Sequence, residues 1–143
     1  MNRKIVFLLL LALPLCLALA ACGDKPEPSP TPEPTFMMDI GQQFQNNVKP
    51  DPDDKYDVIY SRCRVAVEAV SEEELAILAE NESHIRDIIN TIMSSKTLKE
   101  LERSDAKERL KTEISEHIVV ALADKGITDL AGVYFSDYLT IKQ

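Results

Sequence analysis

The sequence predicts an α+β fold in which two to three helices cover one face of a small sheet. Apolar and polar residues alternate over residues 56–70 and again over residues 133–141, which is the pattern of strands with one buried face. Between these segments, apolar residues recur at every third or fourth position, as they do in amphipathic helices. A layer of helices packed on a sheet buries both kinds of apolar face.

The domain is expected over residues 36–143, and its first part carries few regular features. Residues 36–44 are expected as an edge strand or an extended lead-in, and the polar, proline-containing residues 46–55 as a loop. The strand over residues 56–70 then places two sets of side chains on opposite faces. The expected buried set is Ile59, Cys63, Val65, Val67 and Ala69, and the expected outer set is Tyr60, Arg62, Arg64 and Glu68.

A long amphipathic helix is expected to begin after Ser71. The Ser-Glu-Glu-Glu segment at residues 71–74 fits a capping box, in which Ser71 caps the helix and Glu74 reaches back to the Ser71 amide. The helix is expected to bend near Asn81 and to end at residues 94–95. Its apolar stripe consists of Leu75, Leu78, Ile85, Ile88, Ile89, Ile92 and Met93.

Two more helices are expected before the last strand. Thr97 and Glu100 fit a second capping box, which opens a short helix. Asp105 with Glu108 is expected to start a longer helix. Gly126, which follows a basic residue, can adopt the left-handed conformation and is expected to end that helix. The stripe of this longer helix consists of Leu110, Ile114, Ile118, Ala121 and Leu122.

The last strand is expected over residues 133–141, again with one buried face. The expected buried set is Val133, Phe135, Leu139 and Ile141, and the expected outer set is Tyr134, Ser136, Tyr138 and Thr140. Asp137 interrupts the apolar face, so a bulge or an edge position is expected there.

Residues 1–21 are predicted to be a lipoprotein signal peptide. Arg3 and Lys4 form a basic start, and an apolar run broken by one proline leads to Leu19-Ala20-Ala21-Cys22. This ending resembles the bacterial lipobox, in which cleavage falls between Ala21 and Cys22 and the Cys22 thiol carries lipid. The alternative is an uncleaved signal anchor, which would make the chain a single-pass membrane protein with an incidental thiol at Cys22.

Residues 22–35 are expected to comprise the lipidated cysteine and a proline-rich linker. Proline occupies every second position from Pro26 to Pro34, which favours polyproline II and a semi-rigid spacer of roughly 40 Å. A ligand for a proline-binding domain is the alternative, but such domains are mostly intracellular. We therefore expect a stalk that holds the domain away from the lipid surface.

The charge and the cysteines limit the classes of partner. Removal of Arg3 and Lys4 with the signal leaves 14 basic and 24 acidic residues, a formal charge of −10, which argues against nucleic acid and against adsorption to anionic lipid. The anchor must therefore supply the membrane affinity. With Cys16 removed and Cys22 acylated, Cys63 has no disulfide partner and is expected as a small buried apolar residue.

The sequence offers no arrangement of residues that is typical of an enzyme, a metal site or a cofactor site. His84 and His117 lie on different expected helices, far apart in the chain and without a cysteine or paired carboxylate. The acidic residues 51–54 lack the glycine and distal glutamate of a calcium loop and are expected as a solvated turn. Residues 72–74 carry carboxylates suited to the first turn of a helix.

Four segments of the C-terminal half form an ordered series. They are Ile85-Arg86-Asp87-Ile88-Ile89, Ser94-Ser95-Lys96-Thr97 with Leu101, Lys107-Glu108-Arg109-Leu110-Lys111 with Glu113-Ile114, and Val133-Tyr134-Phe135-Ser136-Asp137-Tyr138. Their order and spacing resemble the flagellar basal body-associated FliL family over residues 56–143. Members of that family usually have glycine where Ala106 stands, asparagine where His117 stands, and an uncleaved transmembrane helix in place of the lipobox.

The resemblance implies a stomatin-like fold and a non-enzymatic accessory of the flagellar motor. It also implies a ring of copies that contacts stator and basal-body proteins and supports flagellar rotation, motility and chemotaxis. Together with the lipobox, it places the domain on the extracytoplasmic face of the bacterial cytoplasmic membrane, lipid-anchored at the flagellar basal body. The alternative function is an envelope lipoprotein with a solute-binding or stress-related role that shares the domain.

Overall fold

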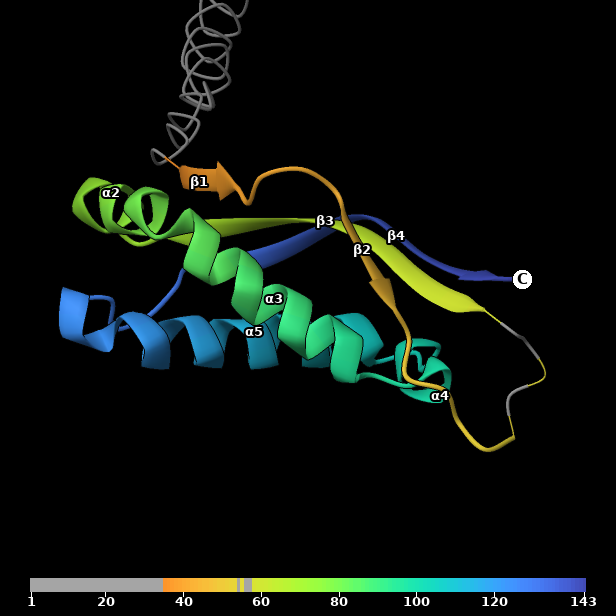
Figure 1. The fold of residues 1–143 in the computed structure, drawn as a ribbon. Helices are drawn as coiled ribbons and strands as arrows, with labels where there is room; N and C mark the ends of the chain where they lie inside the picture. The colour runs from red at the N-terminus through yellow and green to blue at the C-terminus, as the bar shows by residue number, and fades with distance from the viewer. Residues whose placement is uncertain (1–34, 54, 56–57) are drawn as a thin grey trace, which may run out of the picture. The chain divides into compact units, whose positions relative to one another are not determined.

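The structure is a computed structural model that describes residues 35–53, 55 and 58–143 (Figure 1). The expected signal peptide, Cys22 and nearly all of the expected linker lie outside the described residues. The elements in chain order are β1 (Phe36–Asp39), β2 (Phe44–Asn47), β3 (Ile59–Ala69), α2 (Glu72–Glu80), α3 (Glu82–Ser95), α4 (Leu98–Leu101), α5 (Ala106–Leu122), the short 3-10 helix η1 (Ala123–Lys125) and β4 (Gly132–Lys142). This arrangement confirms the predicted α+β class.

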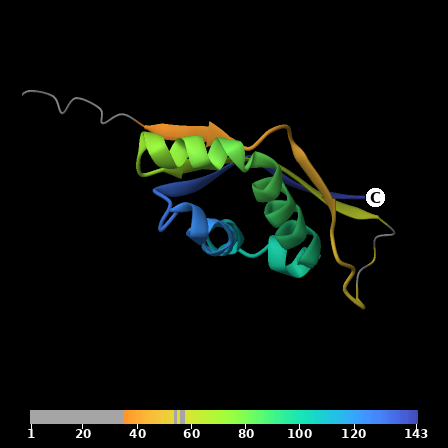
Figure 2. The same ribbon diagram turned by 60° about the vertical axis from the view of Figure 1, so that its left-hand side comes forward.

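The sheet has four antiparallel strands, with β3 at its centre. β1 pairs with the C-terminal part of β3 and β2 with its N-terminal part, both along one edge, while β4 pairs along the other edge. Helices α2, α3 and α5 lie on one side of this sheet, and none of the described helices lies on its other side (Figure 2). Among the described residues, no helix has both the length and the apolar content needed to cross a membrane.

The core lies between the sheet and the helices, and it contains most of the residues predicted for it. The expected buried face of β3 is confirmed, because its odd-numbered residues are buried throughout. The helices contribute the buried residues Leu78, Ile85, Ile89, Ile92, Met93, Leu98, Leu101, Leu110, Ile114, Ile118 and Leu122. Burial of side chains of this size stabilises the fold by about 1.5–3 kcal/mol each relative to exposure.

The prediction of a loop over residues 46–55 is wrong at its start, because Asn46 and Asn47 belong to β2. Asn46 occupies a position on the buried face and is 6% exposed. Its side-chain amide donates to the Asn90 carbonyl and to Asn90 Oδ1, both at 3.2 Å. An amide in place of an apolar residue interrupts the alternation in the sequence, and its hydrogen bonds to α3 offset the cost of burying it.

The junction between β3 and the helices follows the prediction with one correction. Ser71 Oγ accepts a hydrogen bond from the Glu74 amide at 3.2 Å, as expected for a helix cap. The Glu74 carboxylate, however, accepts from the Val70 amide at 3.2 Å and not from the Ser71 amide. The expected bend is present, since α2 ends and α3 begins on either side of Asn81.

The bulge expected at Asp137 is present and reverses the faces of the strand beyond it. Arg62 pairs with Leu139 but Arg64 pairs with Ser136, so two residues of β4 stand opposite one of β3. Asp137 has a φ of 53°, and Leu139, predicted to be buried, is 47% exposed. Tyr138, predicted to face outward, instead packs against the core, and its hydroxyl donates to the Leu101 carbonyl at 3.2 Å.

Cys63 is fully buried on β3, as predicted, and burial raises the pKa of its thiol to about 11. Because the folded thiol holds its proton to a higher pH than the unfolded thiol, folding stability should fall as pH rises from about 9 toward 11. We expect the free energy of unfolding to be about 2 kcal/mol lower near pH 11, because at that pH the unfolded thiol is ionised while the folded thiol still partly holds its proton. Urea denaturation at several pH values measures this loss. The free energy of unfolding of Cys63→Ala should fall less steeply as the pH rises above 9. An identical decline in both proteins would contradict the assignment.

Candidate interaction surfaces

Two surfaces of the described domain are candidates for binding, and the first is a groove between α3 and α5. We call it the helix groove, and it has a volume of about 470 Å³. It is lined by His84, Asp87, Ile88, Thr91, Ile92, Ser95, Glu113 and His117. The α3 residues recur at three- and four-residue steps, so they share one face of that helix, and α5 supplies the opposite wall.

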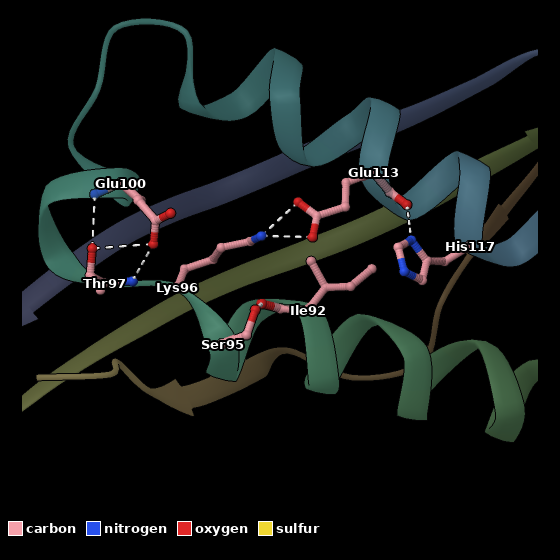
Figure 3. A network of polar contacts seen from close by, with 7 residues as sticks. All are labelled: Ile92, Ser95, Lys96, Thr97, Glu100, Glu113 and His117. Carbon is pink, nitrogen blue, oxygen red and sulfur yellow. Dashed lines mark hydrogen bonds and ion pairs between the residues drawn. The ribbon is translucent and has the colours of Figure 1, made fainter.

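An ion pair joins the residue that follows α3 to Glu113 of α5, which also lines the helix groove. Lys96 Nζ lies 2.6 Å from each carboxylate oxygen of Glu113 (Figure 3). The side chains are 18% and 34% exposed, so solvent screens this pair less than an exposed one. Charge-assisted hydrogen bonds of this kind fix geometry, and here they hold α5 against the turn that follows α3.

The turn after α3 is organised by the predicted capping box of α4. Thr97 Oγ1 accepts from the Glu100 amide, and the Glu100 carboxylate accepts from the Thr97 amide at 2.9 Å (Figure 3). The hydrogen bond from the Thr97 amide is the largest cause that lowers the pKa of Glu100. The box sets the direction of the chain directly beside Lys96, and so supports the ion pair.

We expect Thr97→Ala to lower the free energy of unfolding by about 1 kcal/mol, because the first turn of α4 then loses its cap. Chemical denaturation of the two proteins measures the difference. Thr112→Ala is the control, since the Thr112 hydroxyl donates only to the Glu108 carbonyl within its own helix. Equal effects of the two substitutions would show that the capping box does not stabilise the turn.

The structure brings the two histidines to the same groove, although they are far apart in the sequence. His117 Nδ1 lies 2.8 Å from the Glu113 carbonyl oxygen, which orients the ring along α5 (Figure 3). His84 stands on the α3 wall. Within residues 35–53, 55 and 58–143, no three His, Cys, Asp or Glu side chains are arranged to hold a metal ion.

The second candidate is the side of the sheet that the helices leave uncovered. We call it the open sheet face; it consists of Tyr60, Arg62, Arg64, Ala66, Glu68, Tyr134, Ser136, Leu139, Ile141 and Met37. Three large apolar side chains are exposed on it, namely Met37 (47%), Tyr134 (42%) and Leu139 (47%). The Tyr134 hydroxyl donates to Glu68 at 2.5 Å, and this hydrogen bond raises the pKa of Tyr134.

The remaining residues singled out in the sequence do not form a site with these surfaces. Ala21 and Cys22 lie outside the described residues. Glu72, Glu73 and Glu74 occupy the first turn of α2, as expected for carboxylates near exposed helix amides. Neither candidate surface could be identified from spacing alone, because each depends on how distant segments pack together.

Comparison with known proteins gives this domain its family. The model of the flagellar basal body-associated protein FliL family matches residues 37–140, from within β1 to within β4. The flagellar protein FliL of Aquifex aeolicus (strain VF5) is 31% identical over 81 residues, which are 57% of this chain and 48% of that protein. The chain thus spans about half the length of that relative. Proteins of this family are flagellar accessory proteins and not enzymes. The match covers most of the chain and every strand of the sheet, and the chain therefore belongs to the FliL family.

Proposed function

We propose that the chain is a lipid-anchored accessory of the flagellar motor on the extracytoplasmic face of the bacterial cytoplasmic membrane. The observation that carries this proposal is the family match over residues 37–140, which spans the sheet and all the described helices. In this proposal the domain acts by binding other motor proteins.

The membrane attachment rests on Leu19-Ala20-Ala21-Cys22 and the proline-rich residues that follow. Lipid on Cys22 supplies membrane affinity, at about 0.8 kcal/mol per buried methylene of each acyl chain. The linker then holds the domain off the lipid, so that lipid and stalk replace a membrane-spanning helix.

We propose further that copies of the domain associate with one another and contact the stator proteins directly, and that these contacts support the stator. Anchoring confines neighbouring copies near one another, which raises their effective concentration and favours a ring. The exposed face of α3 and the outer side of β4 are the candidate contacts, since they belong to the helix groove and the open sheet face. Stator support of this kind would serve flagellar rotation and, through it, motility and chemotaxis.

The alternative of a solute-binding lipoprotein predicts a concave apolar pocket with converging polar groups. The helix groove has only two apolar residues among its lining, Ile88 and Ile92. Its wall is otherwise polar or charged, and the apolar stripes of α3 and α5 are used in the core. The motor role is therefore the better supported of the two.

An in-frame deletion tests the proposed function. The deletion strain should form filaments but swim and swarm poorly, with a larger defect in viscous agar, where the motor works against a higher load. Complementation with the intact gene should restore both. Normal swimming and swarming of the deletion strain at high viscosity would refute the motor role.

A further inference from the structure

We propose that the helix groove between α3 and α5 binds a basic amphipathic helix of a partner protein, whose lysine or arginine side chains donate to its walls. The polar groups whose hydrogen-bonding roles are fixed along this groove are acceptors, and its floor is apolar. The partner belongs to the motor proteins of the proposed function, on which this inference rests, and the groove indicates which kind of segment is bound.

His117 presents an acceptor to the groove from the α5 wall. Its Nδ1 lies 2.8 Å from the Glu113 carbonyl oxygen, and because a carbonyl oxygen can only accept, Nδ1 carries a proton and donates it (Figure 3). In the neutral imidazole the other ring nitrogen, Nε2, is then an acceptor. No residue of the described domain donates to Nε2, so a donor from a partner can do so.

Ser95 and Glu113 present further acceptors near the C-terminal end of α3. The Ser95 hydroxyl donates to the Ile92 carbonyl at 2.7 Å, which leaves the lone pairs of its oxygen to accept (Figure 3). Lys96 Nζ lies 2.6 Å from each carboxylate oxygen of Glu113. This contact neutralises the charge of Glu113 but leaves another acceptor position on each oxygen.

Asp87 supplies the negative charge of the groove. It is exposed on the α3 wall and makes no ion pair with any other residue that the structure describes. The described residues that line the groove include no lysine or arginine. An ammonium or guanidinium group brings only donors, and so it matches a wall of acceptors with an unpaired carboxylate. The groove therefore fits lysine or arginine side chains.

The floor and the length of the groove indicate that these cations are carried by a helix. Ile88 is partly buried and Ile92 is 4% exposed, and the two lie one turn apart on α3. From His84 to Ser95 the α3 wall extends over three turns, roughly 17 Å at the helical rise per residue. An amphipathic helix laid along such a groove buries its apolar stripe on the floor and places basic residues beside both walls.

The charge of the chain favours the same partner. The formal charge is −8, so long-range electrostatics attract a basic segment and repel an acidic one. A second copy carries the same net charge. We therefore assign the groove to a partner of opposite charge and not to self-association.

The test uses the full lipidated chain in non-ionic detergent micelles and three fluorescein-labelled fourteen-residue peptides. The first is an amphipathic helix of leucine, alanine and lysine, and the second has glutamate in place of each lysine. The third has the composition of the first in an order that forms no apolar stripe. Fluorescence anisotropy should show that the first peptide binds at least tenfold more tightly than the third and that the acidic peptide does not bind. Because the first and third peptides carry the same charge, their difference reports the groove and not the net charge of the chain.

Two substitutions at exposed positions of the α3 wall should weaken binding of the basic helix. Asp87→Asn removes the charge at nearly constant shape and should weaken binding about tenfold, the effect of one charge-assisted hydrogen bond. Thr91→Lys places a competing cation in the groove and should abolish binding. Asp39→Asn is the control, because it makes the same change of charge at an exposed position of β1 outside the groove, and it should leave binding unchanged.

Equal binding of the amphipathic and the reordered basic peptides would overturn the inference, as would unchanged binding by Thr91→Lys at an unchanged melting temperature. Sedimentation of the protein alone tests the other occupant: self-association that Thr91→Lys abolishes would assign the groove to a second copy and contradict the basic partner. The deletion strain tests the proposed function separately. Poor swimming of that strain together with normal swimming of a Thr91→Lys strain would overturn the groove assignment and leave the motor role standing.

Discussion

Cys22→Ala is expected to remove the protein from the membrane fraction and to reproduce the motility defect of the deletion. Without the thiol, no thioether to lipid forms, and the affinity contributed by the acyl chains is lost. Membrane fractionation, metabolic labelling with a fatty acid and swimming assays in viscous agar measure the three consequences. This is the largest functional effect that we expect from a single substitution.

Cys16→Ala is the matched control for this experiment. Cys16 lies within the expected signal peptide, so its replacement should change neither acylation nor membrane retention. Membrane retention of the Cys22→Ala protein without acylation would contradict the lipid anchor and would favour the uncleaved, single-pass alternative. If the Cys22→Ala protein leaves the membrane but the strain remains fully motile, the anchor is not required for the function.

Phe44→Ala is expected to cause the largest loss of stability, about 3–5 kcal/mol of the free energy of unfolding. Phe44 is 2% exposed on β2, and the guanidinium of Arg86 lies over its ring, 4.6 Å from the centroid. Arg86 Nη1 also donates to the carbonyls of Ile40 and Gln42 in the turn before β2. Loss of the ring therefore removes packing in the core. It also removes the surface on which the Arg86 guanidinium lies while it connects this turn to α3.

Urea denaturation followed by circular dichroism measures this loss. Phe36→Ala is the control, because Phe36 is only partly buried at the start of β1 and should cost less. A loss such as this is a large share of the roughly 5–15 kcal/mol typical of a domain. A change below about 1 kcal/mol would contradict the placement of β2 in the core, since truncation of a buried phenylalanine costs more.

Regular alternation and capping motifs in the sequence were sufficient to predict most of the helices and both long strands. α5 and β3 each bury one face and expose the other, so apolar residues recur along them with a clear helical or strand period. β2 was missed because Asn46 is polar and yet buried, an exception made possible by Asn90 on a distant helix. The side-chain directions after Asp137 were reversed because a bulge adds one residue to a strict period of two.

The candidate surfaces were harder to predict than the fold. The sequence predicts the apolar stripe of the long helix, but the groove requires α5 beside α3, which sequence periodicity does not specify. The pairing of Lys96 with Glu113 across these elements is visible only once they are packed. Arg62 was correctly placed on the outer face of its strand, but its unpartnered Nε depends on neighbours from β2 and β4.

The location of the protein in the cell tests the central claim most directly. A fusion of the full chain to a fluorescent protein that matures outside the cytoplasm, imaged with stained filaments, should show discrete spots at filament bases. Those spots should disappear in the Cys22→Ala fusion but persist in the Cys16→Ala fusion. An even signal around the envelope of cells carrying the intact, functional fusion would contradict a lipid-anchored accessory of the flagellar motor.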